Sequence, residues 1–421
     1  MSFSILIAEP LAVDSLYPFS LLHCSWEVRC GALKLFEKVQ ARFPDSPLLF
    51  SGREGRIRSF LSRVPLEQIS APGNILVLHG GILLSQQLTS FLKNTIKSHN
   101  DEPIVFISGS IEICYYIPEI FRLVNNQEFH PDSPFFEDYS LHPVLENALH
   151  FEVESHSITY LWDAIKHNGQ ALIDDADIFV DYENLQNNYH SGLFITNPDA
   201  IFVGENCSIA PNVVLDASEG PIIFGKNVRI MSQSTIMGPC FIGDNSLVKI
   251  GAKIYGNTSI GEFCKVGGEI DSSIIHSYSS KQHDGFVGHS YIGEWVNLGA
   301  DSNTSNLKNT YSQVTVPMNG TMINTEQMFL GLLCGDHSKA GINTMFTTGT
   351  VTGIFANIFG GGFFPQNIKS FSWGGFSDSP IYQFDKAVSV AEIVMQRRNY
   401  TPTTEEKKLW KTVFAQFGNF L

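Results

Sequence analysis

Two histidines in the second half of the chain are the side chains best suited to acid–base chemistry. His283 lies in the run Ser280–Gly288, and His337 follows Gly335-Asp336. An imidazole titrates near neutral pH and can take a proton from a nucleophile as it attacks. A histidine in a loop is more often a surface residue than a catalytic one, so its type alone leaves its role open. His283 is the candidate base and His337 is its rival.

Phosphate chemistry needs a cradle of backbone amides, and the first part of the chain has two weak candidates. Arg29-Cys30-Gly31-Ala32 stands at a predicted helix start, and His79-Gly80-Gly81 stands at a predicted strand end. A helix N-terminus beside an arginine can hold a phosphate. Neither GxxxxGK[ST] nor GxGxxG follows the first predicted strand. Arg29, Gly31 and Gly80 are therefore candidate nucleotide contacts, with an ordinary turn as the equal alternative at each.

The element that must position His283 is a repeat with a period of six. Large apolar residues occupy every sixth position without a break: Phe224, Ile230, Ile236, Ile242, Val248, Ile254, Ile260 and Val266. Mostly small residues stand four positions later, and the turns hold Asn227, Asn245, Gly251 and Asn257. One buried aliphatic per hexad, with turn residues that tolerate positive φ, predicts a left-handed parallel β-helix with three hexads per coil.

The repeat begins before this run and resumes after it. Its further members are Val203, Ile209 and Leu215, then Phe286, Ile292 and Leu298, then Cys334, Ala340 and Phe346, with an end near Gly360–Gly362. The interruptions at 272–285 and 304–332 are predicted to be loops extruded from the coils. In a solenoid such loops usually carry the chemistry, because the coils supply a rigid frame.

The first part of the chain follows a different pattern. Strand-like runs alternate with helix-like ones: Phe3–Ala8, Ala32–Phe43, Leu48–Phe50, Ile75–His79, Leu88–Lys97 and Ile104–Ser108. This alternation predicts a doubly wound α/β domain. After residue 375, apolar stripes through Ala387 and Leu409 predict two closing helices. The predicted divisions are an α/β domain at 1–195, a β-helix at 196–375 and a helical tail at 376–421.

Composition excludes several classes of function. The chain has 421 residues, a net charge of −15 and a pI near 5.3, which argues against nucleic acid or an anionic membrane as the main partner. No apolar run reaches the ~18 residues that span a bilayer. The seven cysteines have no CxxC spacing, so a disulfide framework or zinc site is disfavoured and a reducing cytoplasm is expected.

These motifs resemble a known family. The stretches Ser280–Gly288 and Ile292–Ala300 are similar to the acetyltransferase site of the bifunctional N-acetylglucosamine-1-phosphate uridyltransferase and glucosamine-1-phosphate acetyltransferase family. A divergent bacterial branch of sugar nucleotidyltransferases is more similar still, with Arg29-Cys30-Gly31, Gly335-Asp336-His337 and Phe371–Gly375 in matching order. The resemblance implies a nucleotidyltransferase-like domain followed by an acyltransferase-like β-helix.

The resemblance also implies roles for residues. His283 falls on the general base, Lys249 on a sugar-phosphate contact, Asn297 and Asn306 on the sugar and acetyl pocket, and Ala300 on the coil that faces coenzyme A, with Lys308 as a further substrate contact. The chain departs from the family at Gly267, where a substrate-binding lysine is expected, and at Phe286, where a tyrosine is expected. Gly81 replaces an aspartate that would hold Mg²⁺ in the N-terminal domain, so nucleotidyl transfer lacks its expected metal anchor.

The resulting hypothesis is a cytoplasmic transferase of nucleotide-sugar biosynthesis. It would move an acyl group from acetyl-CoA or another acyl-CoA to an amino-sugar phosphate and assemble as a homotrimer. Nucleotidyl transfer to a sugar 1-phosphate, with Mg²⁺ in the N-terminal domain, is the second activity that the hypothesis includes. The alternative is a trimeric sugar-nucleotide-binding or regulatory protein with a degenerate nucleotidyltransferase domain. Histidines on a β-helix also resemble the trimeric carbonic anhydrases, but Glu294 stands five residues after His289 where those enzymes need a second histidine. No metal ligand is therefore assigned.

Overall fold

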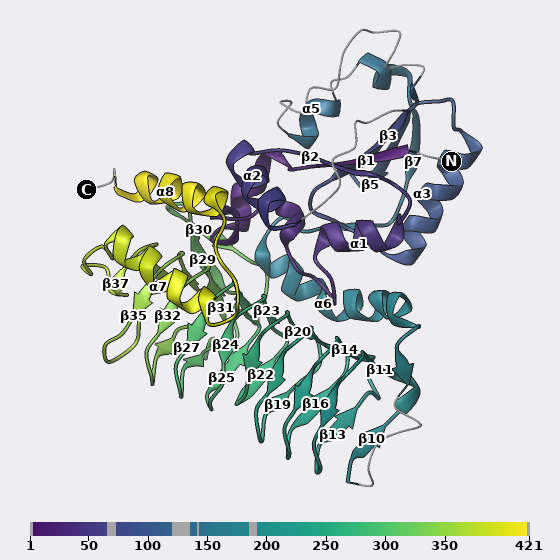
Figure 1. Ribbon diagram of the computed structural model, residues 1–421. Helices are drawn as coiled ribbons and strands as arrows, with labels where there is room; N and C mark the ends of the chain where they lie inside the picture. Colours follow the sequence, from purple (N-terminus) through teal and green to yellow (C-terminus); the bar gives the residue numbers. More distant parts are fainter. Residues whose placement is uncertain (1–2, 65–72, 120–134, 141–142, 185–191, 419–421) are drawn as a thin grey trace.

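The computed structural model describes residues 3–64, 73–119, 135–140, 143–184 and 192–418. Figure 1 shows an N-terminal α/β domain above a long stack of β-helix coils, with two C-terminal helices lying along the later coils. Helix α6 (Leu161–Asp175) lies against β17, β20 and β26 of the stack and is hydrogen-bonded to Gly31 and Lys38 of the N-terminal domain. No helix in the described ranges is both long and apolar enough to cross a bilayer.

The N-terminal domain is built on a six-stranded mixed sheet in the order β2-β1-β3-β6-β5-β7. Its strands are β1 (Phe3–Ala8), β2 (Leu48–Ser51), β3 (Asn74–His79), β5 (Ile104–Ser108), β6 (Ile111–Ile117) and β7 (Leu149–Glu152). Its other helices are α1 (Leu35–Arg42), α2 (Glu54–Arg63), α3 (Gln86–Ser98) and α5 (Phe136–Ser140), and β4 (Ile82–Leu83) pairs with β8 (His156–Ser157). The predicted α/β class is confirmed. Strand β6, which runs antiparallel to β3 and β5, and helix α2 were not predicted.

Three parallel sheets form the faces of the left-handed β-helix. One contains β11 (Ile201–Val203), β14 (Ile222–Phe224), β17 (Cys240–Ile242), β20 (Thr258–Ile260), β23 (Ile274–Ile275), β26 (Tyr291–Ile292), β31 (Leu332–Cys334), β34 (Thr350–Thr352) and β36 (Asn367–Ile368), and β9 (Glu183–Asn184) joins its edge. The second contains β12 (Ser208–Ile209), β15 (Arg229–Ile230), β18 (Leu247–Val248), β21 (Lys265–Val266), β24 (Ser280–Lys281), β27 (Asn297–Leu298), β32 (Lys339–Ala340), β35 (Asn357–Ile358) and β37 (Trp373–Gly374). The third contains β10 (Phe194–Thr196), β13 (Val214–Asp216), β16 (Thr235–Met237), β19 (Lys253–Ile254), β22 (Glu269–Asp271) and β25 (Phe286–Gly288), and β28 (Asn303–Thr304) pairs with β33 (Met345–Phe346) along the same stack.

The hexad register predicted from the sequence is confirmed except at Phe286, where the neighbouring Val287 takes the inward position opposite Ile270. The stack also continues past the predicted end at Gly360–Gly362, through β36 and β37. Every third hexad stacks on the same face, so that Phe224 pairs with Ile242 and Ile242 pairs with Ile260. These side chains are fully buried and form one continuous core along the stack. Burial of each such side chain contributes roughly 1.5–3 kcal/mol to the stability of the fold. Short strands of two or three residues remain stable because this contribution is repeated in every coil.

One predicted loop is wrong and the other is confirmed. Residues 272–285 stay in the coils as β23 and β24. The pattern is lost there because fifteen residues separate Ile260 from its partner Ile275, instead of the eighteen between Ile242 and Ile260. Lys281 also takes an inward position, opposite Val266. Residues 304–332 do leave the stack, as the hairpin of β29 (Thr315–Met318) and β30 (Thr321–Asn324).

One corner of the β-helix carries a stack of residues with left-handed backbone. In the early coils they are asparagines, and Asn227 Nδ2 donates to Asn245 Oδ1 at 3.2 Å. In the later coils they are rings that stack on one another: Phe263, Tyr278, Trp295, His337, Phe355 and Phe371. The change coincides with the arrival of α7 (Phe384–Gln396) and α8 (Thr404–Gly418), which pack on these rings. The two predicted C-terminal helices are thus present.

Candidate functional site

The predicted phosphate loop at Arg29 lies buried between the N-terminal domain and the β-helix. Arg29 Nη2 donates to Glu262 Oε1 at 2.6 Å, and the backbone N–H of Arg29 donates to the Tyr291 hydroxyl at 3.0 Å. The guanidinium also lies 5.5 Å from the ring centroid of Phe241. Burial disfavours the cation, but the Glu262 carboxylate outweighs that effect and raises the pKa of Arg29. The Arg29 side chain, predicted from the sequence to contact a nucleotide, is instead paired with residues of the β-helix.

Gly31 is enclosed in the same interface. Its N–H donates to Asn168 Oδ1 at 2.7 Å, and its carbonyl accepts a bond from Ser259 Oγ at 2.8 Å. Its φ of +84° favours glycine, and a Cβ there would collide with the Asp175 carboxylate, which pairs with Lys38. The Gly31 amide is therefore already bonded within the protein.

The strand end at Gly80 and Gly81 is also closed. The Gly80 N–H donates to Ala8 O at 2.7 Å. A Cβ at Gly81 would lie 2.6 Å from Ile158 O, so the backbone there leaves no room for the aspartate that the resemblance implies.

The carboxylates near these strand ends do not fit a Mg²⁺ site. Glu9 follows β1, and it is fully buried and held by Arg53 through Nε at 3.0 Å and Nη2 at 2.8 Å. Asp163 accepts the N–H groups of Tyr160 and Thr159 at the start of α6. A divalent cation would need oxygen ligands that are free to coordinate it. We therefore derive no step through Mg²⁺.

The N-terminal domain binds a row of carboxylates on the β-helix. Glu262, Glu294 and Asp336 occupy equivalent corner positions in the coils, and they pair with Arg29, Lys34 and His23 respectively. All of these contacts join residues more than two hundred positions apart in the sequence. The row gives the two domains a fixed relative position.

His23 is a buried imidazolium in this row. Its Nδ1 lies 3.1 Å from Glu27 Oε2 and its Nε2 lies 2.6 Å from Asp336 Oδ2, so both nitrogens must donate. Burial disfavours the charge, but Asp336 and Glu27 raise the pKa of His23 to about 10. Arg63 balances Glu27 at 2.6 Å.

His23, Glu294 and Asp336 are close enough together to hold a metal, with ligand atoms within 4.8 Å of one another. The imidazolium of His23 has no lone pair to offer, and Lys34 Nζ lies 3.3 Å from Glu294. His276 adds an Nδ1 contact to Glu294 at 3.0 Å, and burial lowers its pKa. These residues form a charge-balanced interface instead of a donor set for a cation.

Lys249, His283 and Ala300 lie at one corner of the stack, where the second sheet turns into the third, and the coil of Gly267 separates Lys249 from His283. The His283 side chain is exposed, and the buried ammonium of Lys281 donates to the backbone carbonyls of His283 and Asp284. Coils lie about 4.8 Å apart, so Lys249 and His283 are separated by roughly 10 Å. Lys281 was not among the candidates from the sequence, because a lysine at an inward hexad position looks like a break in the repeat.

The remaining substrate-binding candidates do not all reach this corner. Asn297 is exposed on β27, the strand that leads to it. Asn306 lies across β25 at the next corner, where its Nδ2 is 3.0 Å from His289 Nδ1. Lys308 donates to Gln313 O at 2.9 Å within the extruded segment.

The short coil explains one departure from the family. A Cβ at Gly267 would lie 2.5 Å from Gln282 O and 3.0 Å from Lys249 Cβ. The loop that carries His283 is thus drawn over the position at which the family has a lysine.

His337 is part of the stacked corner. Its ring lies 4.4 Å from that of Phe355 at an interplanar angle of 15°, and Trp410 of α8 covers its edge at 5.0 Å. Within the described residues its Nδ1 has no hydrogen-bond partner. Burial lowers the pKa of His337 well below its usual value, so the ring is neutral packing.

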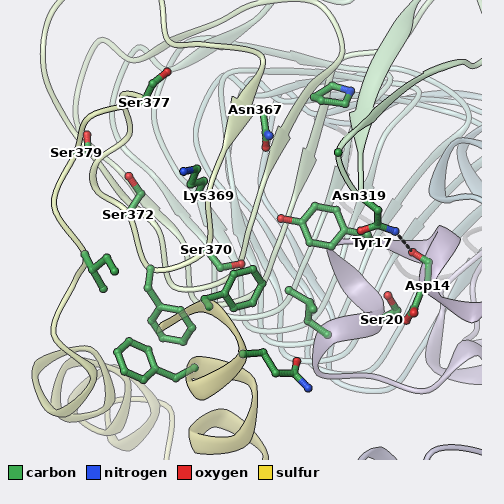
Figure 2. Close-up of a pocket in the computed structure, with 18 of the residues that line it drawn as sticks. Asp14, Tyr17, Ser20, Asn319, Asn367, Lys369, Ser370, Ser372, Ser377 and Ser379 are labelled. Carbon is green, nitrogen blue, oxygen red and sulfur yellow. Dashed lines mark hydrogen bonds between the residues drawn. The ribbon is translucent and has the colours of Figure 1, made fainter. Parts of the chain in front are cut away.

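A cavity of about 860 Å³ was not anticipated from the sequence. It opens where the loops after β1 and β2, the β29–β30 hairpin, the last coils and α8 meet (Figure 2). Its lining includes Asp14, Arg53, Asn319, Lys369 and Phe414. No local motif could have revealed it, because its walls come from segments far apart in the chain.

Comparison with known proteins agrees with this architecture. Residues 5–182 match the family model described as sugar nucleotidyl transferase. The bifunctional protein GlmU of Synechococcus sp. (strain CC9311) is 27% identical over 153 residues, which cover 36% of this chain and 29% of that protein. A bifunctional sugar-1-phosphate nucleotidylyltransferase/acetyltransferase of Sulfurisphaera tokodaii is 34% identical over 93 residues, covering 22% of this chain and 23% of the relative.

The chain thus spans less than a third of the length of these two relatives. Among solved structures, LpxA, a UDP-N-acetylglucosamine acyltransferase from Bacteroides fragilis 9343, is matched with a TM-score of 0.28 at 16% identity over 51% of this chain and 79% of that one. Residues 5–182 thus match the sugar nucleotidyl transferase family model, and the chain is a distant and partial homologue of the bifunctional GlmU proteins.

Proposed function

We propose that the chain is a transferase of sugar-nucleotide metabolism whose β-helix moves an acyl group from an acyl-CoA, such as acetyl-CoA, to an amino-sugar phosphate. The observation that carries the proposal is the exposed imidazole of His283 on a loop held from inside the coil by Lys281. A rigidly placed base open to solvent is what an amine nucleophile requires.

In the proposed reaction His283 takes a proton from the sugar amine while the amine nitrogen forms a bond to the acyl carbon. The carbon–sulfur bond of the thioester then breaks, and the proton passes from His283 to the departing thiolate. Lys249 would pair with the sugar phosphate, and Asn297 would bond the sugar from β27. Ala300 would border the pantetheine arm, while Asn306 and Lys308 remain candidate contacts farther along the sheet.

Nucleotidyl transfer is the second candidate, because the family model covers the N-terminal domain. Arg29 and Glu9, however, both form ion pairs within the protein and are not free to bind a nucleotide or a metal ion. These ion pairs argue against turnover, and the alternative is a domain that binds a sugar nucleotide without turning it over. Pyrophosphate release from UTP or dTTP with sugar 1-phosphates and Mg²⁺ separates the two: robust turnover would contradict the binding-only assignment.

The acyl-transfer proposal is tested with the purified chain, a panel of acyl-CoAs and amino-sugar phosphates, and thiol release as the signal. His283→Ala should lower turnover by roughly 10²–10⁴-fold, the usual contribution of a positioned base, without a change in melting temperature. His150→Ala, which alters an exposed histidine on β7 of the N-terminal domain, is the matched control. Equal turnover in both variants would remove His283 from the mechanism.

A further inference from the structure

We propose that the cavity of about 860 Å³ beside α2 binds a phosphorylated sugar, at a site separate from the His283 corner. Its volume lies in the range of small-molecule sites, roughly 300–1,000 Å³. Figure 2 shows Asp14, Tyr17 and Asn319 on one side of it and Lys369 on the other. Neither His283 nor Gly80 contributes to the lining, so the site belongs to neither predicted reaction centre.

Two cations in the lining are available for an anion. Arg56 has no ion-pair partner among the described residues, and its Nε is buried without a hydrogen bond. All the other arginines and lysines of the described stretch 3–64 form ion pairs. Lys369 is exposed into the cavity and likewise has no ion-pair partner among the described residues. The lining holds three cations, Arg53, Arg56 and Lys369, against the two carboxylates of Asp14 and Asp378, and Asp14 lies 3.6 Å from Arg53. The two cations without an ion pair favour a phosphate in a chain with a net charge of −15.

The rest of the lining fits a polyhydroxyl body. The hydroxyls of Ser372 and Ser379 accept bonds from the N–H groups of Gly375 and Phe376, so their own protons remain free to donate. The side chains of Asn367 and Asp378 are exposed and can exchange hydrogen bonds with sugar hydroxyls. Aromatic rings from the last coils and α8 supply an apolar wall for the face of a sugar ring.

Binding of glucose 1-phosphate, measured by calorimetry with inorganic phosphate, glucose and UMP as comparison ligands, tests the proposal. Lys369→Gln and Arg56→Gln should each weaken glucose 1-phosphate about tenfold or more, because each removes a charge-assisted contact. Arg229→Gln removes an exposed cation from β15, outside the cavity, and should change nothing. Melting curves of each variant verify the fold.

A matched pair of charge insertions sharpens the test. Asn367→Asp places a carboxylate in the cavity, whereas Asn357→Asp makes the same change on β35 outside the lining. Only Asn367→Asp should abolish binding. Undetectable heat at millimolar glucose 1-phosphate, or equal weakening by both substitutions, would overturn the site. Phosphate binding as tightly as the sugar phosphate would overturn the sugar subsite, and tighter UMP binding would replace the sugar by a nucleotide. None of these outcomes depends on acyl transfer.

Discussion

At the scale of single residues, two histidines of similar promise in the sequence have opposite surroundings. His283 is open to solvent on a coil corner, whereas His337 is enclosed by Phe355 and Trp410. A base must exchange protons with its substrate, and an imidazole whose pKa burial has driven well below its usual value is poorly suited to that role. Solvent access, which local sequence does not encode, distinguishes the two.

We expect His337→Phe to keep or raise stability, by about 1 kcal/mol, because it removes an unpaired buried nitrogen and retains the stacking. Phe355 and Phe371 already adopt the same left-handed backbone in later coils. His337→Ala should instead cost about 2–4 kcal/mol through lost packing. Urea denaturation measures both values. Loss of acyl transfer in a stable His337→Phe variant would make His337 the base.

At the scale of elements, the regular coils follow from their own hexads, and the irregular coil depends on one lysine. Lys281 occupies an aliphatic position on β24, and its ammonium holds the loop of His283 and Asp284. Burial lowers the pKa of Lys281 to about 8, a sign that the charge is costly there. The buried Lys281 ammonium therefore lowers the free energy of unfolding, while its hydrogen bonds hold the loop in place.

Lys281→Met should therefore keep the melting temperature or raise it, while acyl transfer falls because the loop loses its internal hydrogen bonds. Lys339→Met is the matched control, since Lys339 donates to the carbonyls of Trp295 and His337 at a different corner. Kinetics and hydrogen exchange of the 282–285 amides report the effect. Faster exchange with unchanged turnover would mean that loop rigidity does not matter for the reaction.

At the scale of the whole molecule, ion pairs between the domains replace the nucleotide contacts expected from the sequence. Removal of one partner from a buried pair typically costs 3–5 kcal/mol, because the other charge stays buried. The ion pairs of Arg29 and His23 with the row of carboxylates on the β-helix therefore couple the stability of the N-terminal domain to that of the β-helix.

The pH dependence of His23 tests this coupling. Its pKa is raised from 6.5 to about 10, so the folded state holds a proton that the unfolded state has lost between these values. The stabilisation is complete below pH 6.5 and is lost as the pH rises towards 10. The unfolding free energy of the wild type minus that of His23→Gln should shrink over that window. A constant difference across it would mean that His23 is not the charged member of the row.

Assembly as a homotrimer is a further expectation. Ile250, Ile342 and Phe359 are exposed at the corner that also carries His283, and apolar residues in a row commonly mark an interface. Ile342→Glu should dissociate the oligomer in sedimentation experiments, whereas Ile111→Glu on the N-terminal domain should not. A stable wild-type monomer at micromolar concentration would contradict the trimer and any site shared between subunits.

The β-helix and most of its register could be predicted from the amino-acid sequence alone. Each hexad carries its own inward residue, and Phe224, Ile242 and Ile260 meet because identical coils stack. The α/β domain was predictable for the same reason, since β1 and α3 each show their periodicity within a few residues. Both depend on information that is local in the chain.

Which charged groups are free to bind a ligand could not be predicted, because it depends on packing between distant segments. Arg29 and Glu262 lie 233 positions apart, and the local sequence around either residue does not predict their ion pair. Lys281 could be recognised as an inward residue only once the short coil had placed it opposite Val266. The cavity lined by Arg53 and Lys369 likewise exists only after five segments distant in the sequence pack together. Periodicity reports which face of an element is buried, but the partner across an interface depends on three-dimensional packing of residues distant in sequence.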